Sequence, residues 1–163
     1  RMTFIQFVLD NREIADMYVY GGHPSHKWKA LNNKKLETFL IQENLGGTEF
    51  KAFFEHSKYK YVMYLDGNTL SDRMRLLLGT RSVIFRLPSR FEEFYSHMLH
   101  ENENYILIRN YNEIPSFIRT FEQYPEIAEN MINNNINFLN THLKHRDILN
   151  YTAELLNGFS KTS

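Results

Sequence analysis

The most informative part of this chain is the stretch Lys58-Tyr-Lys-Tyr-Val-Met-Tyr-Leu-Asp-Gly-Asn-Thr-Leu-Ser-Asp-Arg-Met-Arg75. Residues 61–65 are aromatic and aliphatic, as in a buried strand, and the polar turn Asp66-Gly67-Asn68 follows them. The next residues include three of helix-capping type, namely Thr69, Ser71 and Asp72. The stretch therefore predicts a strand, a turn and a helix in succession.

Such a turn is a natural place for an anion. The first amide groups of the helix, the positive end of its dipole and the guanidinium of Arg73 would all face a ligand at the carboxyl end of the strand. An ordinary strand–turn–helix with a surface arginine has the same local pattern. The glycine spacing matches neither a P-loop nor a dinucleotide fingerprint.

Strand and helix patterns alternate along the rest of the chain. Strands are expected at residues 16–20, 59–65, 82–85 and 105–108. Helices are expected at residues 2–9, 32–43, 70–78, 91–99, 114–124 and 125–143, with a last one capped by Asp147 and ending at Gly158. This order predicts an α/β fold, a Rossmann-like parallel sheet flanked by helices. Ligands of such sheets bind outside the carboxyl ends of the strands, which here continue into residues 20–25, 66–71 and 86–90.

Length and composition narrow the function classes. A chain of 163 residues is long enough for one domain with its own core. Its 19 basic and 19 acidic residues give no net charge, which argues against a protein that binds nucleic-acid duplexes or membrane surfaces. The absence of cysteine excludes disulfides and thiolate metal sites, so we expect a reducing, cytoplasmic location, with a secretory location as the alternative. No apolar run is long enough to predict a transmembrane segment.

A series of short motifs around the opening stretch keeps a fixed order. The motifs are Lys60-Tyr61, Gly67, Ser71 with Arg73, Leu77-Leu78, Ser82-Val83-Ile84 and Glu92 with Tyr95. This order resembles the donor-binding half of one glycosyltransferase family, which includes LpsA-type lipopolysaccharide-modifying enzymes, fungal capsule-associated xylosyltransferases and protein O-glucosyltransferases. A weaker resemblance extends to Arg1-x-x-Phe4 and to residues 114–160, so that nearly the whole chain is covered.

The resemblance implies one lobe of a two-lobed, GT-B-type glycosyltransferase with C-terminal helices. Residues 1–163 would form a single nucleotide-sugar-binding lobe, while the acceptor site and the catalytic base would belong to a missing lobe. The implied reaction is inverting, metal-independent transfer from UDP-glucose or UDP-xylose to a hydroxyl of a glycan, a lipopolysaccharide or a protein. We expect no catalytic residue in this chain, no activity of this chain alone, no cofactor, and a homodimer through the exposed cleft face. Eukaryotic secretory members of the family usually carry cysteines, so their absence here implies a bacterial-type or viral enzyme. The alternative is a non-catalytic nucleotide-binding or interaction module of the same fold.

The resemblance also assigns donor-binding roles to individual residues. Arg73 would bind the diphosphate, with Arg1 as a second arginine, and Glu92 would accept hydrogen bonds from the ribose. Ser82 would contact the donor, and the loop would approach the phosphates through the backbone of Gly67, Asn68, Thr69, Leu70, Ser71 and Asp72. Two of these residues have structural alternatives: Ser82 as a small buried hydroxyl, and Glu92 as a carboxylate favoured by a helix dipole.

Overall fold

The computed structural model describes residues 2–15, 19–20, 42, 46–47, 53–66 and 71–161. Its contacts divide the chain into two compact units, residues 1–55 and 56–163, and each unit is described by itself. The loop predicted at residues 21–25 and the helix predicted at 32–43 lie outside the described residues.

The first unit contains one described helix and one short sheet. Helix α1 (Met2–Asp10) buries Phe4, Ile5, Phe7 and Val8, which recur at the spacing of one helix face. Strand β1 (Val19–Tyr20) pairs in parallel with β2 (Gly46–Gly47) in a sheet of two strands. The strand predicted at residues 16–20 is therefore present at its end, but it does not join the sheet formed by the later strands.

The second unit is organised around a parallel sheet of three strands in the order β3-β4-β5. These are β3 (Tyr61–Tyr64), preceded by the 3-10 helix η2 (Phe53–Lys58), then β4 (Val83–Arg86) and β5 (Ile106–Leu107). The central strand β4 is almost completely buried, with Val83 1% and Ile84 0% exposed. The predicted α/β, Rossmann-like arrangement is confirmed, because all three strands run in the same direction and helices flank the sheet.

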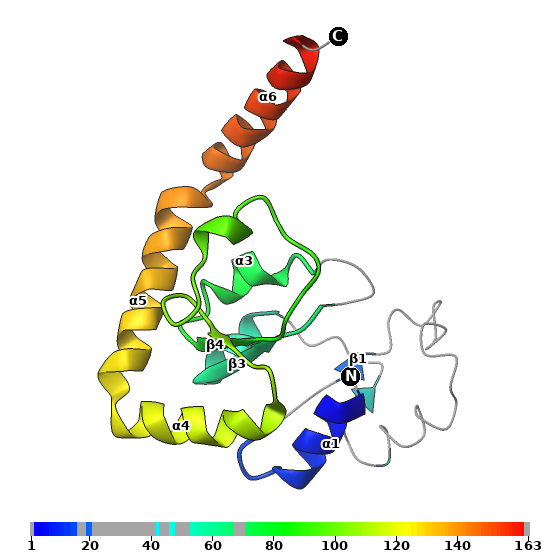
Figure 1. Cartoon of the computed structure of the whole chain (residues 1–163), viewed down its shortest axis with the longest axis vertical. Coiled ribbons are helices and arrows are strands. Elements are labelled where there is room, and N and C mark those ends of the chain that lie inside the picture. The colour runs from blue at the N-terminus through cyan, green and yellow to red at the C-terminus, as the bar shows by residue number, and fades with distance from the viewer. Residues whose placement is uncertain are drawn as a thin grey trace. The chain divides into compact units, whose positions relative to one another are not determined.

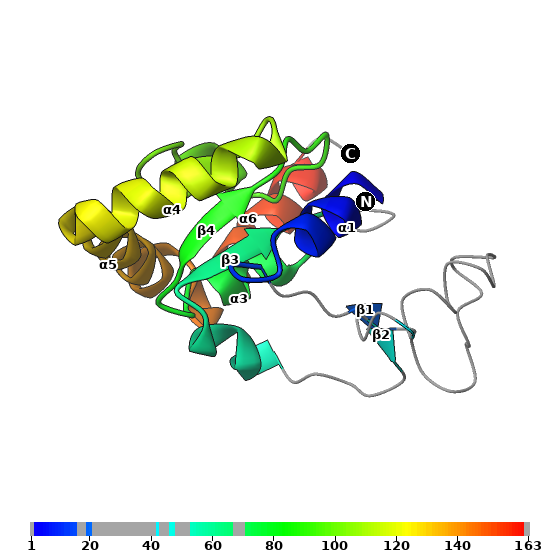
Figure 2. The ribbon, with the colours of Figure 1, turned by 90° about the horizontal axis from the view of Figure 1, so that it is seen from below.

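Helices cover both faces of this sheet, as Figures 1 and 2 show for α3 (Arg73–Leu77) and α4 (Ile114–Gln123). On the α4 face, the Phe85 ring lies 6.3 Å from Phe117 and 5.7 Å from Tyr61. Side chains alternate between the faces of a strand, so Tyr64 and Arg86 share the opposite face with α3. This alternation brings the two polar strand ends to the side of the sheet on which the β3–α3 connection lies.

Two long helices complete the unit. Helix α5 (Pro125–His142) starts with proline at its first position, as predicted, and buries Met131, Asn135 and Phe138. Helix α6 (His145–Lys161) begins where the backbone amide of Lys144 donates to the Asp147 carboxylate at 3.0 Å. It continues past Gly158, the predicted end, because glycine inside a helix costs only about 1 kcal/mol and does not force a stop.

Helix α6 exposes several large apolar side chains, namely Leu149, Leu155, Leu156 and Phe159. In the part of the chain that the structure describes, no helix combines the length and the apolar character needed to cross a membrane.

The helix predicted at residues 91–99 is wrong for most of its length. The structure has turns there, with only the 3-10 helix η3 (Ser96–Met98). The Ser89 hydroxyl oxygen accepts from the Phe91 amide at 2.9 Å, and the Ser96 hydroxyl oxygen accepts from the Glu93 amide at 2.9 Å. Such local side-chain bonds offer the backbone an alternative to helical pairing.

A buried pair of asparagines connects α5 to the loop before β5. The Asn104 side-chain amide donates to the Asn135 side-chain oxygen at 3.1 Å, and the Asn135 amide donates to the Asn104 carbonyl at 2.9 Å. The Asn104 side-chain oxygen also accepts from the His100 amide at 3.0 Å. Asn135 is only 1% exposed, so water cannot replace either asparagine as the hydrogen-bond partner of the other.

We predict that Asn135→Ala lowers the free energy of unfolding by about 2–4 kcal/mol, because it leaves two buried groups of Asn104 without partners. Urea denaturation measures this change. The matched control is Asn134→Ala on the same helix, where the replaced side chain is exposed, and its effect should stay within about 0.5 kcal/mol. Equal effects of the two substitutions would contradict a structural role for the pair.

Candidate functional site

Three hydrogen bonds hold the described ends of the β3–α3 connection. Arg73 Nη2 donates to the Leu65 carbonyl at 2.8 Å, and Arg73 Nε donates to the Ser71 hydroxyl oxygen at 3.0 Å. The Tyr64 hydroxyl donates to the Ser71 carbonyl at 2.8 Å. Arg73 therefore closes the loop at the carboxyl end of β3. Its Nη1 donates to none of the residues that the structure describes.

Part of the predicted site lies outside the described residues, namely Arg1, Gly67, Asn68, Thr69 and Leu70. Ser71 and Asp72 are described at the start of α3. The Asp72 side chain makes no capping hydrogen bond, and α3 has five residues, fewer than the predicted 70–78. The expectation that a helix dipole holds an anion here is correspondingly weakened, because a single turn aligns few peptide dipoles. The cation of Arg73 becomes the main attraction for an anion.

The structure separates Ser82 from this loop. Ser82 immediately precedes β4, at the amino end of the strand, whereas the β3–α3 connection leaves the carboxyl end of β3. Its side chain is 2% exposed and its hydroxyl donates to the Tyr59 carbonyl at 2.7 Å. This geometry favours the structural alternative, a small buried hydroxyl that connects the start of β4 to the segment before β3.

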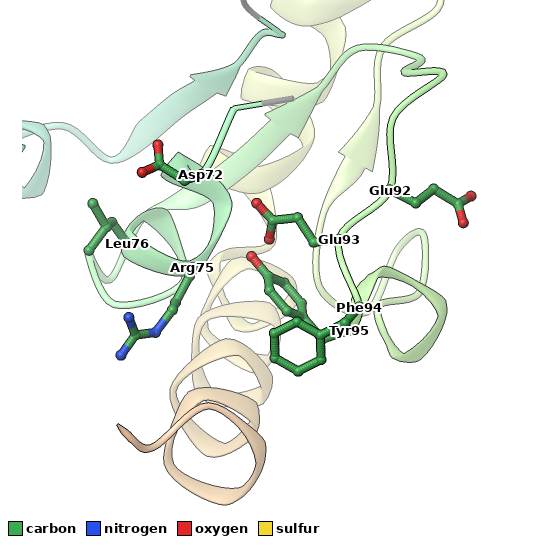
Figure 3. A pocket seen from close by; sticks show the side chains of 7 residues that line it. All are labelled: Asp72, Arg75, Leu76, Glu92, Glu93, Phe94 and Tyr95. Atoms are coloured by element: carbon green, nitrogen blue, oxygen red, sulfur yellow. The ribbon is translucent and has the colours of Figure 1, made fainter. Parts of the chain in front are cut away.

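A pocket of about 430 Å³ lies between α3 and the turns that follow β4. Figure 3 shows the residues that line it: Asp72, Arg75, Leu76, Glu92, Glu93, Phe94 and Tyr95. The Glu93 carboxylate and the Tyr95 hydroxyl point to the same region near α3, whereas the Glu92 carboxylate points away from the other lining side chains. The pocket thus has an apolar wall and an acidic polar end.

Two polar atoms in the pocket lining are buried without a hydrogen-bond partner among the described residues. They are Oε2 of Glu93 and the hydroxyl oxygen of Tyr95, and the whole Tyr95 side chain is only 3% exposed. Leaving such atoms unpaired costs about 1–3 kcal/mol each, so unpaired groups of this kind often indicate the place of a ligand or water.

Glu93 is the residue that sequence reasoning missed. The family resemblance assigned the ribose contact to Glu92, at the start of a helix predicted over residues 91–99. The observed turns bring Glu93 beside Tyr95 instead. The two adjacent glutamates in the sequence indicated a carboxylate at this place. Which of the two faces the pocket depends on the backbone conformation of the turn.

Burial and the nearby Asp72 carboxylate raise the pKa of Glu93 to about 7, and the Arg86 guanidinium partly opposes this rise. Glu93 therefore changes its charge near neutral pH. An ionised Glu93 gains from any ligand that donates hydrogen bonds to it, since donors replace the lost hydration.

The Tyr64 hydroxyl lies among charges of both signs. Burial raises the pKa of Tyr64 to about 12, with Glu93 and Asp66 adding to the rise and Arg86 and Arg73 opposing it. The phenol stays protonated at neutral pH and continues to donate to the Ser71 carbonyl. Tyr64 thus lies near both the arginine of the loop and the glutamate of the pocket.

The arrangement suits a ligand with an anionic part and a hydroxyl-rich part. Arg73 can bind oxygens of an anion, while Glu93 and Tyr95 can bind hydroxyl groups. Among the residues that the structure describes, no group of three histidine, aspartate or glutamate side chains is placed to hold a metal ion.

The chain is similar in sequence to known glycosyltransferases. Residues 23–163 match the model of the family described as glycosyl transferase family 90. The O-glucosyltransferase rumi of Drosophila melanogaster is 26% identical over 113 residues, which cover 68% of this chain and 28% of that protein. Protein O-glucosyltransferase 1 of Homo sapiens is 27% identical over 111 residues, 66% of this chain and 28% of that protein.

A bacterial relative extends the range of similar proteins. The O-glucosyltransferase LpsA of Dichelobacter nodosus is 26% identical over 88 residues, 53% of this chain and 28% of that protein. The match therefore spans little more than a quarter of each of these relatives. The family model covers most of the chain, and the chain belongs to glycosyltransferase family 90.

Proposed function

We propose that this chain binds a UDP-sugar, UDP-glucose or UDP-xylose, as the donor part of an inverting glycosyltransferase of GT-B type. The observation that carries the proposal is one juxtaposition at the carboxyl side of a parallel sheet. Arg73 begins α3 and closes the β3–α3 connection, and the unpaired atoms of Glu93 and Tyr95 lie in the pocket beside α3. Family membership and relatives named O-glucosyltransferases support the reading of this site as a donor site.

Each part of the donor has a chemical counterpart in the site. Arg73 would bind the diphosphate and stabilise its growing charge as the sugar leaves. Ionised Glu93 would accept hydrogen bonds from the ribose hydroxyls, and the Tyr95 hydroxyl would bind an oxygen of the same part of the donor. Glu93 takes this role in preference to Glu92 because its oxygen is the one buried in the pocket. The acceptor would be a hydroxyl of a glycan, a lipopolysaccharide or a protein.

We predict that Arg73→Ala weakens UDP binding by about 1.5–3 kcal/mol, the usual worth of a hydrogen bond to a charged group. Titration calorimetry of folded wild-type and variant protein measures the change. Tyr64→Phe is the matched control, since it removes the other hydrogen bond to Ser71 and keeps the arginine. The control should lose less affinity than Arg73→Ala. Equal losses would show that Arg73 only orders the loop, and no UDP binding by the wild type would favour an interaction module.

The affinity for uridine should rise as the pH is raised from about 6 to about 8, and then level off. The pKa of Glu93 is raised to about 7 in the free protein. Hydroxyl donors favour the ionised form, so binding releases a proton and is weaker below this pKa. Uridine avoids the titration of a phosphate group. Fluorescence or calorimetric titrations at several pH values measure the trend.

The pH trend has two matched variants. Glu93→Gln should bind uridine with little pH dependence, whereas Glu92→Gln should keep the wild-type trend because its carboxylate points away from the pocket. The reverse pattern would return the ribose contact to Glu92.

UDP binding should not need a divalent cation, because an arginine takes the place that a metal ion occupies in metal-dependent donor sites. The measurement is the UDP affinity in EDTA compared with the affinity in Mg²⁺ and in Mn²⁺. The three values should agree. Binding that EDTA abolishes and Mn²⁺ restores would exclude this mode of diphosphate binding.

A further inference from the structure

Arg86 is a cation at the carboxyl edge of the sheet that the donor site described above does not use. It is the last residue of β4 and lies in register between Tyr64 of β3 and Leu107 of β5. The loop closed by Arg73 leaves the same edge, one strand away, because Arg73 donates to the carbonyl that directly follows β3. Two arginines therefore lie at the ends of neighbouring parallel strands.

Aromatic rings hold the Arg86 guanidinium in place. Its Cζ lies 4.9 Å from the ring centroid of Tyr105 and 6.0 Å from that of Tyr64. Contacts of this kind orient the cation without using its N–H groups. Arg86 makes no ion pair or side-chain hydrogen bond with the residues that the structure describes, in contrast to Arg109, which is paired with Glu101 at 3.1 Å. Its donors are thus oriented and available to a ligand.

The electrostatics of the neighbouring groups show that Arg86 lies near both parts of the site. The positive charges of Arg86 and Arg73 both lower the pKa of Tyr64, against the larger effect of burial. Arg86 also lowers the pKa of Glu93. Two guanidinium groups therefore lie near the Tyr64 side chain. Such a pair suits a ligand with two adjacent anionic groups, as in a diphosphate.

We propose that Arg86 binds the phosphate groups of the donor together with Arg73. The proposal deepens the function proposed above and rests on it for the identity of the ligand as a nucleoside diphosphate. It adds a donor-binding residue that the sequence motifs do not single out, since Arg86 appears there only as the first residue of one of the three connections at the carboxyl ends of the strands.

A purely indirect role makes a different prediction. If Arg86 only keeps Glu93 ionised, its removal weakens the binding of uridine and of UDP by the same factor, and inorganic pyrophosphate is unaffected. If Arg86 binds phosphate, its removal weakens UDP and pyrophosphate and leaves uridine nearly unchanged at a pH well above 7, where Glu93 is ionised in either protein.

The experiment is calorimetric titration of the full chain and of Arg86→Gln with UDP, uridine and inorganic pyrophosphate at about pH 8.5, a pH chosen to keep Glu93 ionised. Arg81→Gln is the matched control. It removes the same charge beside the opposite end of the same strand, since Arg81 is exposed and lies two residues before β4. Thermal unfolding of each variant shows that it is folded.

We expect Arg86→Gln to lower the affinities for UDP and for pyrophosphate by about tenfold, and Arg81→Gln to leave both near the wild-type values. Equal losses for uridine and UDP, or no loss for pyrophosphate, would overturn the proposal. Wild-type protein that binds pyrophosphate through Arg86 but not UDP would overturn the proposed donor and keep the anion contact. Wild-type protein that binds neither would overturn both. If Arg86→Gln does not fold, Arg86→Lys replaces it, with a smaller loss expected because lysine keeps the charge without the planar, ring-oriented donors.

Discussion

The parallel pairing of β3, β4 and β5 is the constraint on which the rest of the second unit depends. Parallel neighbours cannot be joined by a tight turn, so each strand must be followed by a connection that returns to the other edge of the sheet. All three strands then end at one edge. The polar residues that follow them, which are far apart in the sequence, are brought to the same side of the unit by this geometry alone.

Side-chain hydrogen bonds decide what these connections look like. Arg73 and Tyr64 close the β3–α3 connection through Leu65 and Ser71. After β4, the hydroxyl oxygens of Ser89 and Ser96 accept hydrogen bonds from backbone amides in a segment of turns. In the connection to β5, Asn104 is held by Asn135 of α5. Apolar packing of β4 thus stabilises the sheet, whereas specific polar contacts fix the loops around the pocket.

Acidic and basic side chains lie close together in the site. Three acids and one arginine line the pocket itself, and Arg73 and Arg86 belong to the strand ends beside it. Arg86 opposes the rise in the pKa of Glu93 that burial and Asp72 cause. A carboxylate oxygen that is buried without a partner is costly to a folded protein, and a ligand that pairs this oxygen recovers part of the cost. This site, in a member of glycosyltransferase family 90, is the basis of the donor-binding proposal.

Local sequence patterns were sufficient to predict several elements of the fold. The apolar runs predicted β3, β4 and β5 to within two residues at each end, Pro125 marked the start of α5, and the polar turn directed attention to Arg73. Only the tertiary structure decided that Glu93 enters the pocket, that Ser82 lies at the far end of β4 and that Arg86 faces two tyrosine rings. The reason is physical. Strand and helix preferences arise from residues a few positions apart, whereas the side of a turn on which a carboxylate lies depends on bonds made by Ser89 and Ser96, and the surroundings of Arg86 come from residues of three separate segments.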